Sequence, residues 1–570
     1  MRYQVWAPAA GRAEVEVDGV RTPLAAEPGG WWRGEARAGR DYGFALDGGP
    51  TLPDPRSARQ PCGPDGPSRL VDHAAFRWSD SGWHGRALPG AVLYELHVGT
   101  FTPAGTFAGA EQRLDHLVEL GVDFVQLLPV CPFPGRHGWG YDGVAPWAVH
   151  EPYGGPEGLK RFVDAAHRKG LGVILDVVHN HLGPSGNHLP AFGPYFTERH
   201  QTPWGAAVNL DAPGSDEVRA YLIGSALAWL RDYRIDGLRL DAVHALVDDR
   251  AVHFLEELAT AVQRLAVAER RPLFLIGESD LNNPRVTDPV GLGGYGLNAQ
   301  WSDDFHHALH AAATGETQGY YADFGRAPLA ALARTLTRGW FHDGTWSSFR
   351  GRHHGRPFPT ASGGHRLLGY AQTHDQIGNR ARGDRLTVDQ LALTATLVFT
   401  SPFTPMLFMG EEWGAATPWQ YFTDHTDPQL AEAVRQGRRR EFAAYGWAAD
   451  QVPDPQEPAT VLRSTLDWTE PRAGRHAELL AWYRQLIRLR REHPELVDPD
   501  LSAVEVEFDE AQGQLTVHRG AFRIAVNFGD KPGELPAGEP VAHWGERGAG
   551  RLGPRSCAIT RGAVTRGAGS

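Results

Sequence analysis

The feature that most constrains the fold of this chain is a regular alternation of short apolar runs with amphipathic helical stretches from Ala91 onward. A chain that alternates strands and helices in this way forms a parallel sheet covered by helices. The strand-like runs span residues 91–99, 122–130, 171–178, 235–241, 272–278, 297–303, 367–375 and 404–412. Eight strand–helix units in succession predict an α/β fold, a (β/α)8 TIM-type barrel, rather than an open sheet.

Two further domains are expected on either side of this region. Residues 1–85 are rich in Gly and Pro and contain short alternating runs such as "AEVEV", which predict a small antiparallel β domain. The predicted barrel spans residues 86–497, with an excursion at about 182–212 and an insertion at about 423–468. Runs such as "GQLTVHRG" predict a C-terminal β domain over residues 498–570.

Two local features of the barrel region are also predicted. Residues 215–233 are expected to form a helix with Ser215 as its N-cap, because a serine side chain can accept a hydrogen bond from the first helical turn. The basic run "RQGRRREF", which begins at Arg435, is interpreted as the solvated face of a helix.

The composition argues against several classes of partner and site. A formal net charge of −12 disfavours a nucleic acid or an anionic membrane, because those partners attract basic patches. The three scattered cysteines, Cys62, Cys131 and Cys557, cannot form a disulfide framework or a C-x-x-C metal pair. No secretory signal or apolar run of transmembrane length is visible, so we expect a cytoplasmic protein without a cofactor.

Polar side chains gather where the predicted strands end, and in a barrel of this kind the carboxyl ends of the strands carry the catalytic groups. The residues are Asp176, His179, Asn180 and His181 on the third strand, Arg239 and Asp241 on the fourth, Glu278 on the fifth, and His374 and Asp375 on the seventh. One polar residue after a strand is usually a loop cap. Polar residues at the ends of four strands together predict one shared site.

Three carboxylates, Asp241, Glu278 and Asp375, should therefore converge. Two convergent carboxyl groups can cleave a glycosidic bond, because one can attack the anomeric carbon while the other protonates the leaving oxygen. Arg239 would orient Asp241 as the nucleophile, and Glu278, which follows the apolar "FLI", is placed to hold a proton as the general acid. We expect the Asp241 and Glu278 carboxyl groups to lie roughly 5 to 5.5 Å apart, the separation of retaining enzymes.

A zinc site made of His179, His181 and His188 is a conceivable alternative. No H-E-x-x-H helix or cysteine pair supports it, and such histidines more often form local hydrogen bonds. The prediction is therefore that these residues bind no metal.

Aromatic side chains crowd into the predicted loops and favour a sugar ligand, because aromatic faces pack against the C–H faces of pyranose rings. A single tryptophan more often packs in a core, so the crowding is the informative part. The residues are Trp139, Tyr141, Trp147 and Tyr153 after the second strand, Trp204 after the third, and Trp413 and Trp419 after the eighth.

Four motifs in order, "DVVHNH", "GLRLDAVH", "GE" after an apolar strand, and "THD", resemble those of the α-amylase superfamily of retaining glycoside hydrolases and transglycosylases. The resemblance implies that Asp241 is the nucleophile, Glu278 the acid/base and Asp375 the transition-state stabiliser. It also implies a set of substrate-binding residues: Tyr141, His181, Arg239, His244, Asp303, Asp304, His307, His374 and Gln376.

Within the superfamily, the chain is most similar to the maltooligosyltrehalose trehalohydrolase family, on stretches such as "YELHVGTFTPAGTF", "QTHDQIGNRARGDRL" and "FMGEEWGAATPWQYFTDH". The resemblance implies hydrolysis of the α-1,4 bond next to a terminal trehalose, with maltooligosyltrehalose and related α-glucans as partners. It also implies that residues 1–85 form an N-terminal β-sandwich of the carbohydrate-binding type. A glucan branching enzyme, which shares "YELHVGTF" and "FMGEEWG", and a general α-amylase-type hydrolase are the alternatives. The stretches "SDDFHHALH" and "GYYADF" weigh against branching, and the presence of all three carboxylates disfavours a non-catalytic glucan-binding barrel.

Overall fold

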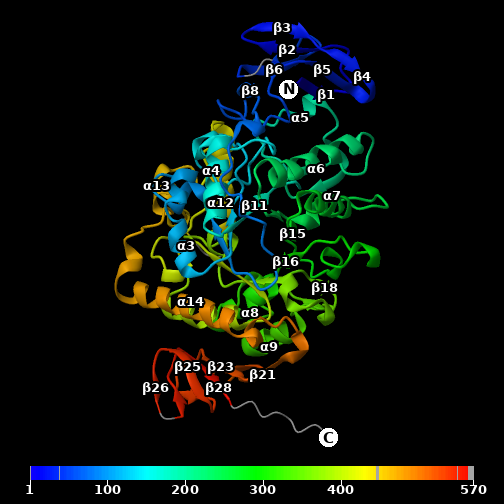
Figure 1. The fold of residues 1–570 in the computed structure, drawn as a ribbon. Helices are drawn as coiled ribbons and strands as arrows, with labels where there is room; N and C mark the ends of the chain where they lie inside the picture. Colours follow the sequence, from blue (N-terminus) through cyan, green and yellow to red (C-terminus); the bar gives the residue numbers. More distant parts are fainter. Residues whose placement is uncertain (1, 37–38, 444–447, 549, 563–570) are drawn as a thin grey trace.

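The computed structural model of the chain describes residues 2–36, 39–443, 448–548 and 550–562. The N-terminal strands lie at one end of the molecule, the C-terminal strands lie at the opposite end, and a body of strands and helices lies between them (Figure 1). Among the helices described, none combines the length and the hydropathy that crossing a membrane requires.

Eight parallel strands close into a barrel in the central body, which confirms the predicted (β/α)8 fold. Each strand lies within one of the apolar runs identified in the sequence, because those runs supply the side chains that fill and surround the barrel. The strands are β9 (Leu93–Leu96), β10 (Phe124–Leu127), β11 (Gly172–Val177), β14 (Gly237–Leu240), β15 (Phe274–Gly277), β16 (Ala299–Trp301), β19 (Leu367–Gly369) and β20 (Thr404–Phe408).

The interior of the barrel changes from apolar to charged toward the carboxyl ends of the strands. Residues two apart on a strand share one face. On β11, Ile174 belongs to an apolar cluster and Asp176 follows on the same face, and on β9 Leu93 is followed by Glu95 in the same way. The parallel register then sets Asp176 directly beside Arg239 of β14. A charged layer is thereby built on top of an apolar one.

Helices lie around the strands of the central body (Figure 1). Leu159 and Phe162 are buried on α4 (Gly155–Arg168), and a capping box of Thr387 and Gln390 begins α11 (Val388–Thr400). The other covering helices are α3 (Leu114–Leu120), α6 (Ser215–Asp232), α7 (Phe254–Glu269), α8 (Asp303–Thr314) and α14 (Gly474–Glu492).

Three long connections add structure to the barrel. The predicted excursion contains α5 (Leu189–Phe192) and the hairpin of β12 (Phe196–Thr202) and β13 (Gly205–Val208), and the predicted insertion contains α12 (Pro428–Ala443) and α13 (Pro458–Arg463). The third connection, between β16 and β19, was not predicted. It contains α9 (Pro328–Arg338) and the hairpin of β17 (Thr345–Ser347) and β18 (Arg352–His354).

One local prediction is wrong, and another holds for only part of its residues, since Arg440 of the basic run is exposed. The N-cap of α6 is Gly214 rather than Ser215, because Gly214 adopts a φ of 83° and starts the helix one residue earlier, without a side-chain cap. The basic run lies on α12, but Arg438 is not solvated there. Its guanidinium packs over the Tyr421 ring and donates to the carbonyl oxygen of Gly378, so this arginine attaches α12 to the body.

The flanking regions are antiparallel sheets, and the predicted domain boundaries at residues 85 and 497 stay predictions. The N-terminal strands form the sheets β1-β5-β4 and β3-β2-β6-β7, with β8 paired to β6, and the C-terminal strands form β21-β22-β23-β28-β25 and β24-β27-β26. The N-terminal bounds are β1 (Arg2–Trp6), β2 (Ala13–Val17), β3 (Val20–Pro23), β4 (Ala25–Glu27), β5 (Trp31–Glu35), β6 (Asp41–Leu46), β7 (Thr51–Leu52) and β8 (Ser68–Arg69). The C-terminal bounds are β21 (Val504–Asp509), β22 (Gln514–Arg519), β23 (Phe522–Asn527), β24 (Gly533–Glu534), β25 (Glu539–Trp544), β26 (Arg547–Gly548), β27 (Arg551–Leu552) and β28 (Ser556–Arg561).

Candidate active site

Arg239 lies at the centre of the candidate site and is completely buried on β14. Its Nη1 donates to Oδ2 of Asp176 at 2.7 Å and to Oδ1 of Asp241 at 3.0 Å, and its Nη2 forms an ion pair with Oε2 of Glu278 at 2.9 Å. The guanidinium also lies 4.3 Å from the ring centroid of Trp301. A buried charge is tolerated when it is paired in this way. Arg239 therefore joins the two carboxylates that the sequence predicts as nucleophile and acid.

Asp241 directly follows β14 and is held from two sides. Arg239 binds one oxygen, and Nδ2 of Asn180 donates to the other, Oδ2, at 2.7 Å. The next residue, Ala242, has a φ of 39°, a left-handed conformation that is strained for a residue with a Cβ atom. The chain therefore turns sharply after Asp241, whose side chain is 11% exposed.

Glu278 follows β15 and accepts a hydrogen bond from the backbone N–H of Ala242 at 2.7 Å, so the strained turn links the two carboxylates. Burial raises the pKa of Glu278, and the charge of Asp241 adds to this rise while Arg239 opposes it. The Glu278 side chain is 21% exposed. A carboxyl group with a raised pKa and access to solvent can hold a proton and donate it to a bound ligand.

Asp375 lies in the first turn of α10 (His374–Gly378), a short helix that Thr373 caps. Its Oδ2 is 3.4 Å from Nε2 of His374, and its side chain is 33% exposed. Burial raises the pKa of Asp375, His374 opposes the rise, and the charge of Glu278 adds to it. The third predicted carboxylate therefore shares the electrostatic environment of the other two.

Tyr141, in the loop after β10, connects the two sides of this group. Its hydroxyl donates to Oδ2 of Asp176 at 2.6 Å and lies 2.8 Å from Nε2 of His374. The rings of Tyr141 and His374 stack with their centroids 5.2 Å apart. Burial raises the pKa of Asp176 to about 7, while Arg239 and the Tyr141 hydroxyl oppose the rise. The carboxylates, Arg239, Tyr141 and His374 thus form one continuous network.

His181 lies at the edge of the network and presents an aromatic surface with Trp204. Its Nε2 is 3.0 Å from the carbonyl oxygen of Tyr141, and its other ring nitrogen contacts the side chain of Asn180. The ring stacks on Trp204 of the excursion with the centroids 4.4 Å apart and the planes 4° from parallel. Burial lowers the pKa of His181, which favours the neutral ring.

His244 and Gln376 lie next to the network, and within the described ranges no hydrogen bond engages either side chain. His244 is exposed on the turn after Asp241, and its charge lowers the pKa of nearby Glu278. Gln376 is half-buried on α10 and lines a cavity of about 210 Å³ with residues such as His306. The side chains of His244 and Gln376 are therefore free to make the predicted contacts with substrate.

Asp303 begins α8 and belongs to the same acidic environment. It accepts a hydrogen bond from the Tyr370 hydroxyl at 2.6 Å. Burial raises the pKa of Asp303 to about 7, the Tyr370 hydroxyl opposes this, and the charge of Glu278 adds to it. Asp303 is therefore placed beside the predicted general acid.

Asp304 and His307 have mainly structural surroundings. Oδ2 of Asp304 accepts hydrogen bonds from the backbone N–H groups of Phe341 and His342, each at 2.8 Å, so this carboxylate holds the connection that carries α9. His307 packs against Tyr320, with ring centroids 4.5 Å apart, and burial lowers the pKa of His307 to about 3. Contact of these two side chains with substrate stays a prediction.

Most of the aromatic residues expected near a sugar are enclosed by other parts of the protein. Trp413 and Trp419 are fully buried, Tyr153 is nearly so, and Trp139 stacks on Trp419. The expectation that these four face a ligand is wrong, because the loops pack against one another and bury them. Trp204, in contrast, is 49% exposed.

Three residues that support the network had no role assigned from the sequence. Asp176 and Asn180 were noted as strand-end residues only, and Glu95 on β9 was not identified. Glu95 accepts hydrogen bonds from His374, as described below. A glutamate at an inward position of the apolar run "LYEL" is the signal that could have found it.

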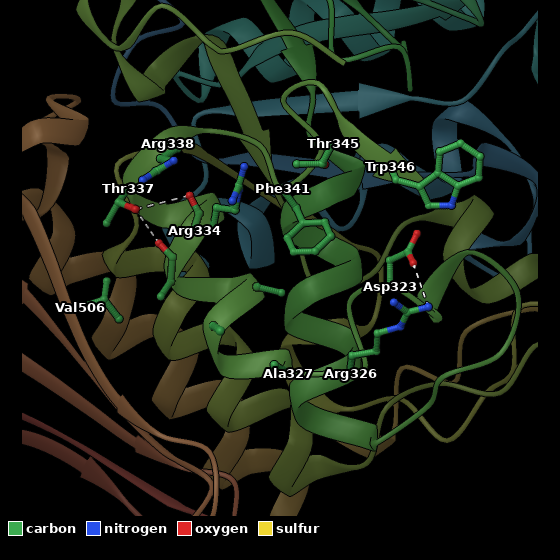
Figure 2. A pocket seen from close by; sticks show the side chains of 13 residues that line it. Asp323, Arg326, Ala327, Arg334, Thr337, Arg338, Phe341, Thr345, Trp346 and Val506 are labelled. Atoms are coloured by element: carbon green, nitrogen blue, oxygen red, sulfur yellow. Dashed lines mark hydrogen bonds and ion pairs between the residues drawn. The ribbon is translucent and has the colours of Figure 1, made fainter. Parts of the chain in front are cut away.

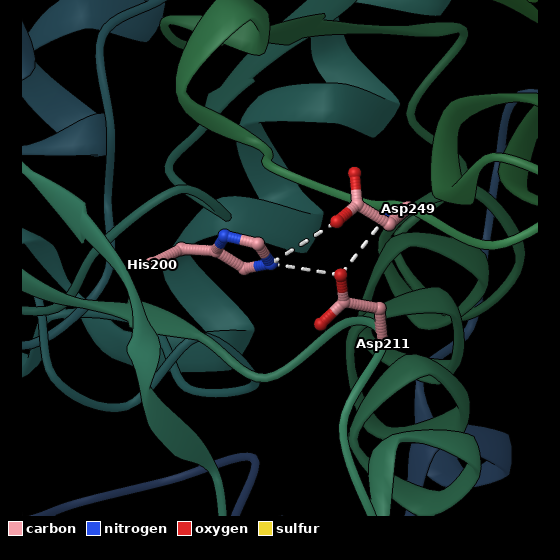
Figure 3. A group of neighbouring side chains, drawn as sticks. All are labelled: His200, Asp211 and Asp249. Atoms are coloured by element: carbon pink, nitrogen blue, oxygen red, sulfur yellow. Dashed lines mark hydrogen bonds and ion pairs between the residues drawn. The ribbon is translucent and has the colours of Figure 1, made fainter.

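One group of His, Asp and Glu side chains in the described ranges is close enough to share a metal ion: His200, Asp211 and Asp249 (Figure 3). Nε2 of His200 lies 2.8 Å from Oδ2 of Asp211, and Arg199 lies 3.0 Å from Asp249 and 3.8 Å from Asp211. Arg199 therefore balances the carboxylates, and the group is an ion-pair network. His179, His181 and His188 do not meet in such a group.

A groove of about 560 Å³ lies along α9, between the β17–β18 hairpin and Val506 of β21 (Figure 2). Arg326, Arg334 and Arg338 line it together with Trp346. None of the predicted site residues contributes to its lining, so this groove is distinct from the carboxylate network.

Comparison with known proteins agrees with this geometry. Residues 74–190 match the family described as alpha amylase, catalytic domain, and residues 499–559 match a domain of unknown function, DUF3459. The chain is 56% identical to a malto-oligosyltrehalose trehalohydrolase of Arthrobacter ramosus, with 97% of both chains aligned. It is 55% identical to one of Rhizobium sp. (strain M-11), over 93% of this chain and 91% of that relative. The crystal structure of a Salmonella typhimurium protein described as an alpha amylase superposes with a TM-score of 0.91 at 37% identity, covering 99% of this chain and 97% of the other.

Proposed function

The chain belongs to the malto-oligosyltrehalose trehalohydrolase family, and on this premise we propose that it releases trehalose from maltooligosyltrehalose by hydrolysing the adjacent α-1,4-glucosidic bond. It is a glycoside hydrolase of the alpha-amylase type. The observation that supports the chemistry best is that one buried guanidinium, Arg239, contacts both Asp241 and Glu278. The two carboxyl groups contact the two terminal nitrogens of one guanidinium. At that spacing one can act on the anomeric carbon and the other on the glycosidic oxygen of the same bond.

In the first step, a carboxylate oxygen of Asp241 attacks the anomeric carbon of the glucose unit that precedes trehalose. Glu278 donates its proton to the glycosidic oxygen as the carbon–oxygen bond breaks, and trehalose leaves with that proton as a new hydroxyl group. The raised pKa of Glu278 keeps the proton available for this transfer. The remaining maltooligosaccharide is then an ester of Asp241.

In the second step, water replaces trehalose. Glu278, now a carboxylate, accepts a proton from the water while the water oxygen attacks the anomeric carbon and Asp241 is released. Two displacements at the same carbon retain its α configuration. Asp375 is proposed to stabilise the positive charge that develops on the sugar, because its side chain is partly exposed beside the other two carboxylates.

The product pattern tests this function. Purified protein is incubated with maltopentaose and, separately, with its trehalose-terminated counterpart, and the products are resolved by chromatography. Free trehalose from the second substrate, with little change in the first, is the expected result. Equal cleavage of both would reduce the function to a general α-amylase-type hydrolase, and new α-1,6 linkages without trehalose would instead indicate a branching enzyme.

A further inference from the structure

Glu95 is a completely buried carboxylate at the end of β9, and both of its oxygens are directed at one residue. Oε2 accepts a hydrogen bond from the backbone N–H of His374 at 3.0 Å, and Oε1 lies 2.9 Å from Nδ1 of the same histidine. Nε2 of Gln126 makes a longer contact with Oε1, at 3.3 Å. Glu95 reaches no other part of the carboxylate network directly in the described contacts. Its hydrogen bonds therefore act on the site through His374, and its charge also raises the pKa of Asp375.

The opposite side of the His374 ring faces acceptors as well. Nε2 lies 2.8 Å from the Tyr141 oxygen and 3.4 Å from Oδ2 of Asp375. The Tyr141 hydroxyl proton is used in the bond to Asp176, whose Oδ2 also accepts from Arg239. The Tyr141 oxygen can then only accept from His374. When Glu95 and Asp176 are ionised, Nδ1 and Nε2 both donate and both carry hydrogen atoms, and only the imidazolium form of histidine does so.

We propose that Glu95 is a positioning residue that holds His374 as an imidazolium and so directs a fixed N–H donor and a positive charge toward the sugar on which Asp241 acts. This inference rests on the proposed function, because it assigns the sugar to the network around Asp241. Burial alone would lower the pKa of His374, but Asp375 and Glu95 together raise it to about 9. The charge state inferred from the hydrogen bonds is therefore maintained at neutral pH.

Charged and titratable groups from several neighbouring elements surround His374. They are Glu95 on β9, His97 after β9, Tyr141 after β10, Asp176 on β11, Arg239 on β14 and Asp375 on α10. Loss of the His374 proton would leave Nε2 or Nδ1 as an acceptor. To satisfy an acceptor at Nε2, Tyr141 would have to turn its hydroxyl away from Asp176. A change at Glu95 would thereby reach Arg239 by way of His374, Tyr141 and Asp176, and would reach the nucleophile Asp241 through Arg239.

The substitution Glu95→Gln removes the negative charge of this side chain and keeps its size and shape. The amide oxygen can still accept from the His374 backbone, but the amide NH2 group then faces Nδ1, which leaves the histidine neutral. We expect kcat on trehalose-terminated maltopentaose to fall about tenfold near pH 8, with KM within about twofold of wild type. The deficit should shrink as the pH falls, because the histidine of the variant regains its proton only at lower pH than in the wild type. A deficit that does not depend on pH would overturn the proposal.

The chain offers a matched control, Glu412→Gln. Glu412 is equally buried, and its Oε1 lies 2.8 Å from Nε2 of His116, but that histidine is on α3, outside the barrel. This variant should show the wild-type dependence of kcat on pH. If Glu412→Gln reproduced the pH-dependent deficit, a general effect of removing buried charge would explain both variants, and the proposal would fail.

A double-mutant cycle tests whether Glu95 acts through His374. In a His374→Gln background, Glu95→Gln should cause little additional loss of kcat. An equal loss in both backgrounds would contradict the proposal. Should Glu95→Gln fail to fold, Glu95→Asp carries the test, because it keeps the charge and should keep the wild-type pH dependence even if kcat is lower. A pH dependence altered in Glu95→Asp would then count against the proposal.

The proposed function and the proposed role of Glu95 are tested by different measurements, so either can fail without the other. Trehalose release by the wild-type enzyme tests the function. An enzyme that cleaved maltopentaose equally well would have a different specificity, yet the ratio of wild-type to Glu95→Gln kcat could still be followed with pH on that substrate.

Discussion

Nη1 of Arg239 on β14 lies 3.0 Å from Oδ1 of Asp241, which directly follows the strand, so the two residues are two positions apart in one short segment. The period of a strand alone brings them to the same face. Their contact is shared with Asp176 and Glu278 on the neighbouring strands, so a buried positive charge is surrounded by carboxylates that it orients.

Replacing Glu278 by Gln removes the proposed acid. Hydrolysis of the trehalose-terminated substrate should fall by roughly 10²- to 10⁴-fold, because the leaving oxygen is no longer protonated. A maltooligosyl fluoride has a leaving group that needs no proton, so formation of the glycosyl-enzyme from it should be almost normal. Asp241→Asn is the matched contrast and should be inactive on both substrates. Equal losses of Glu278→Gln on both substrates would place the acid elsewhere.

The anomeric configuration of the first product should be retained. Because Asp241 and Glu278 contact the two terminal nitrogens of one guanidinium, we expect the short carboxyl separation, roughly 5 to 5.5 Å, that leaves no room for water between them and the sugar. Proton NMR spectra recorded within the first minutes of reaction should show the α-anomer of the maltooligosaccharide. An initial β-anomer would indicate an inverting reaction and a different role for Asp241.

Asp176→Asn should weaken both stability and activity. The Asp176 carboxylate is buried and accepts from Arg239 and Tyr141, and the variant leaves a buried guanidinium with one fewer negative partner. We expect the free energy of unfolding to fall by about 3 kcal/mol, measured by urea unfolding followed by circular dichroism. Asp530→Asn removes the exposed ion pair with Arg555 and is the control, with a change below about 1 kcal/mol. Similar decreases in the free energy of unfolding of the two variants would show that the buried ion pair stabilises the fold no more than the exposed one.

Trp204→Ala should affect substrate binding rather than folding. Trp204 is half-exposed and stacks on His181, so its free face can pack against a sugar ring. A rise in KM of roughly two- to tenfold with little change in kcat is expected from the loss of one such contact. Trp419→Ala provides the comparison, because that buried ring should instead lower the free energy of unfolding by about 3 kcal/mol or more. Loss of stability in Trp204→Ala would contradict the assignment.

A second buried histidine gives the stability a dependence on pH. His167 lies between Asp80 and Asp236, with Nδ1 and Nε2 at 2.7 and 2.9 Å from their carboxylates. Burial opposes its charge, but the hydrogen bonds that it donates to Asp236 and Asp80 leave the pKa of His167 raised above its ordinary value of 6.5. The folded state binds this proton more tightly than the unfolded state, so the stabilisation is complete below about pH 6.5 and is lost as pH rises through the folded-state pKa.

This dependence can be measured as the difference in apparent Tm between wild type and His167→Gln at several pH values. The difference should be largest near pH 6 and should decrease toward pH 9 and above. His353→Gln, a surface histidine, should show no such trend. A constant difference for His167→Gln across this range would mean that packing against Trp83, rather than charge, accounts for the effect.

The sequence by itself determined the barrel, the order of its strands and the carboxylates at the strand ends. These features depend on the local pattern of apolar residues: a run such as "LGVILDVV" forms a strand wherever it lies, and the period of a strand carries Ile174 and Asp176 to one face. Asp241, Glu278 and Asp375 could be named for the same reason, since each follows such a run.

Only the tertiary structure decided which groups these carboxylates meet and which aromatic rings stay accessible. Glu95 and His374 are 279 positions apart in the chain, and they meet because closure of the barrel brings the end of β9 close to the chain that follows β19. Closure likewise stacks loops from distant units, so Trp419 is buried against Trp139 while Trp204 remains exposed. Such contacts depend on packing between segments far apart in sequence, and no local pattern of residues encodes them.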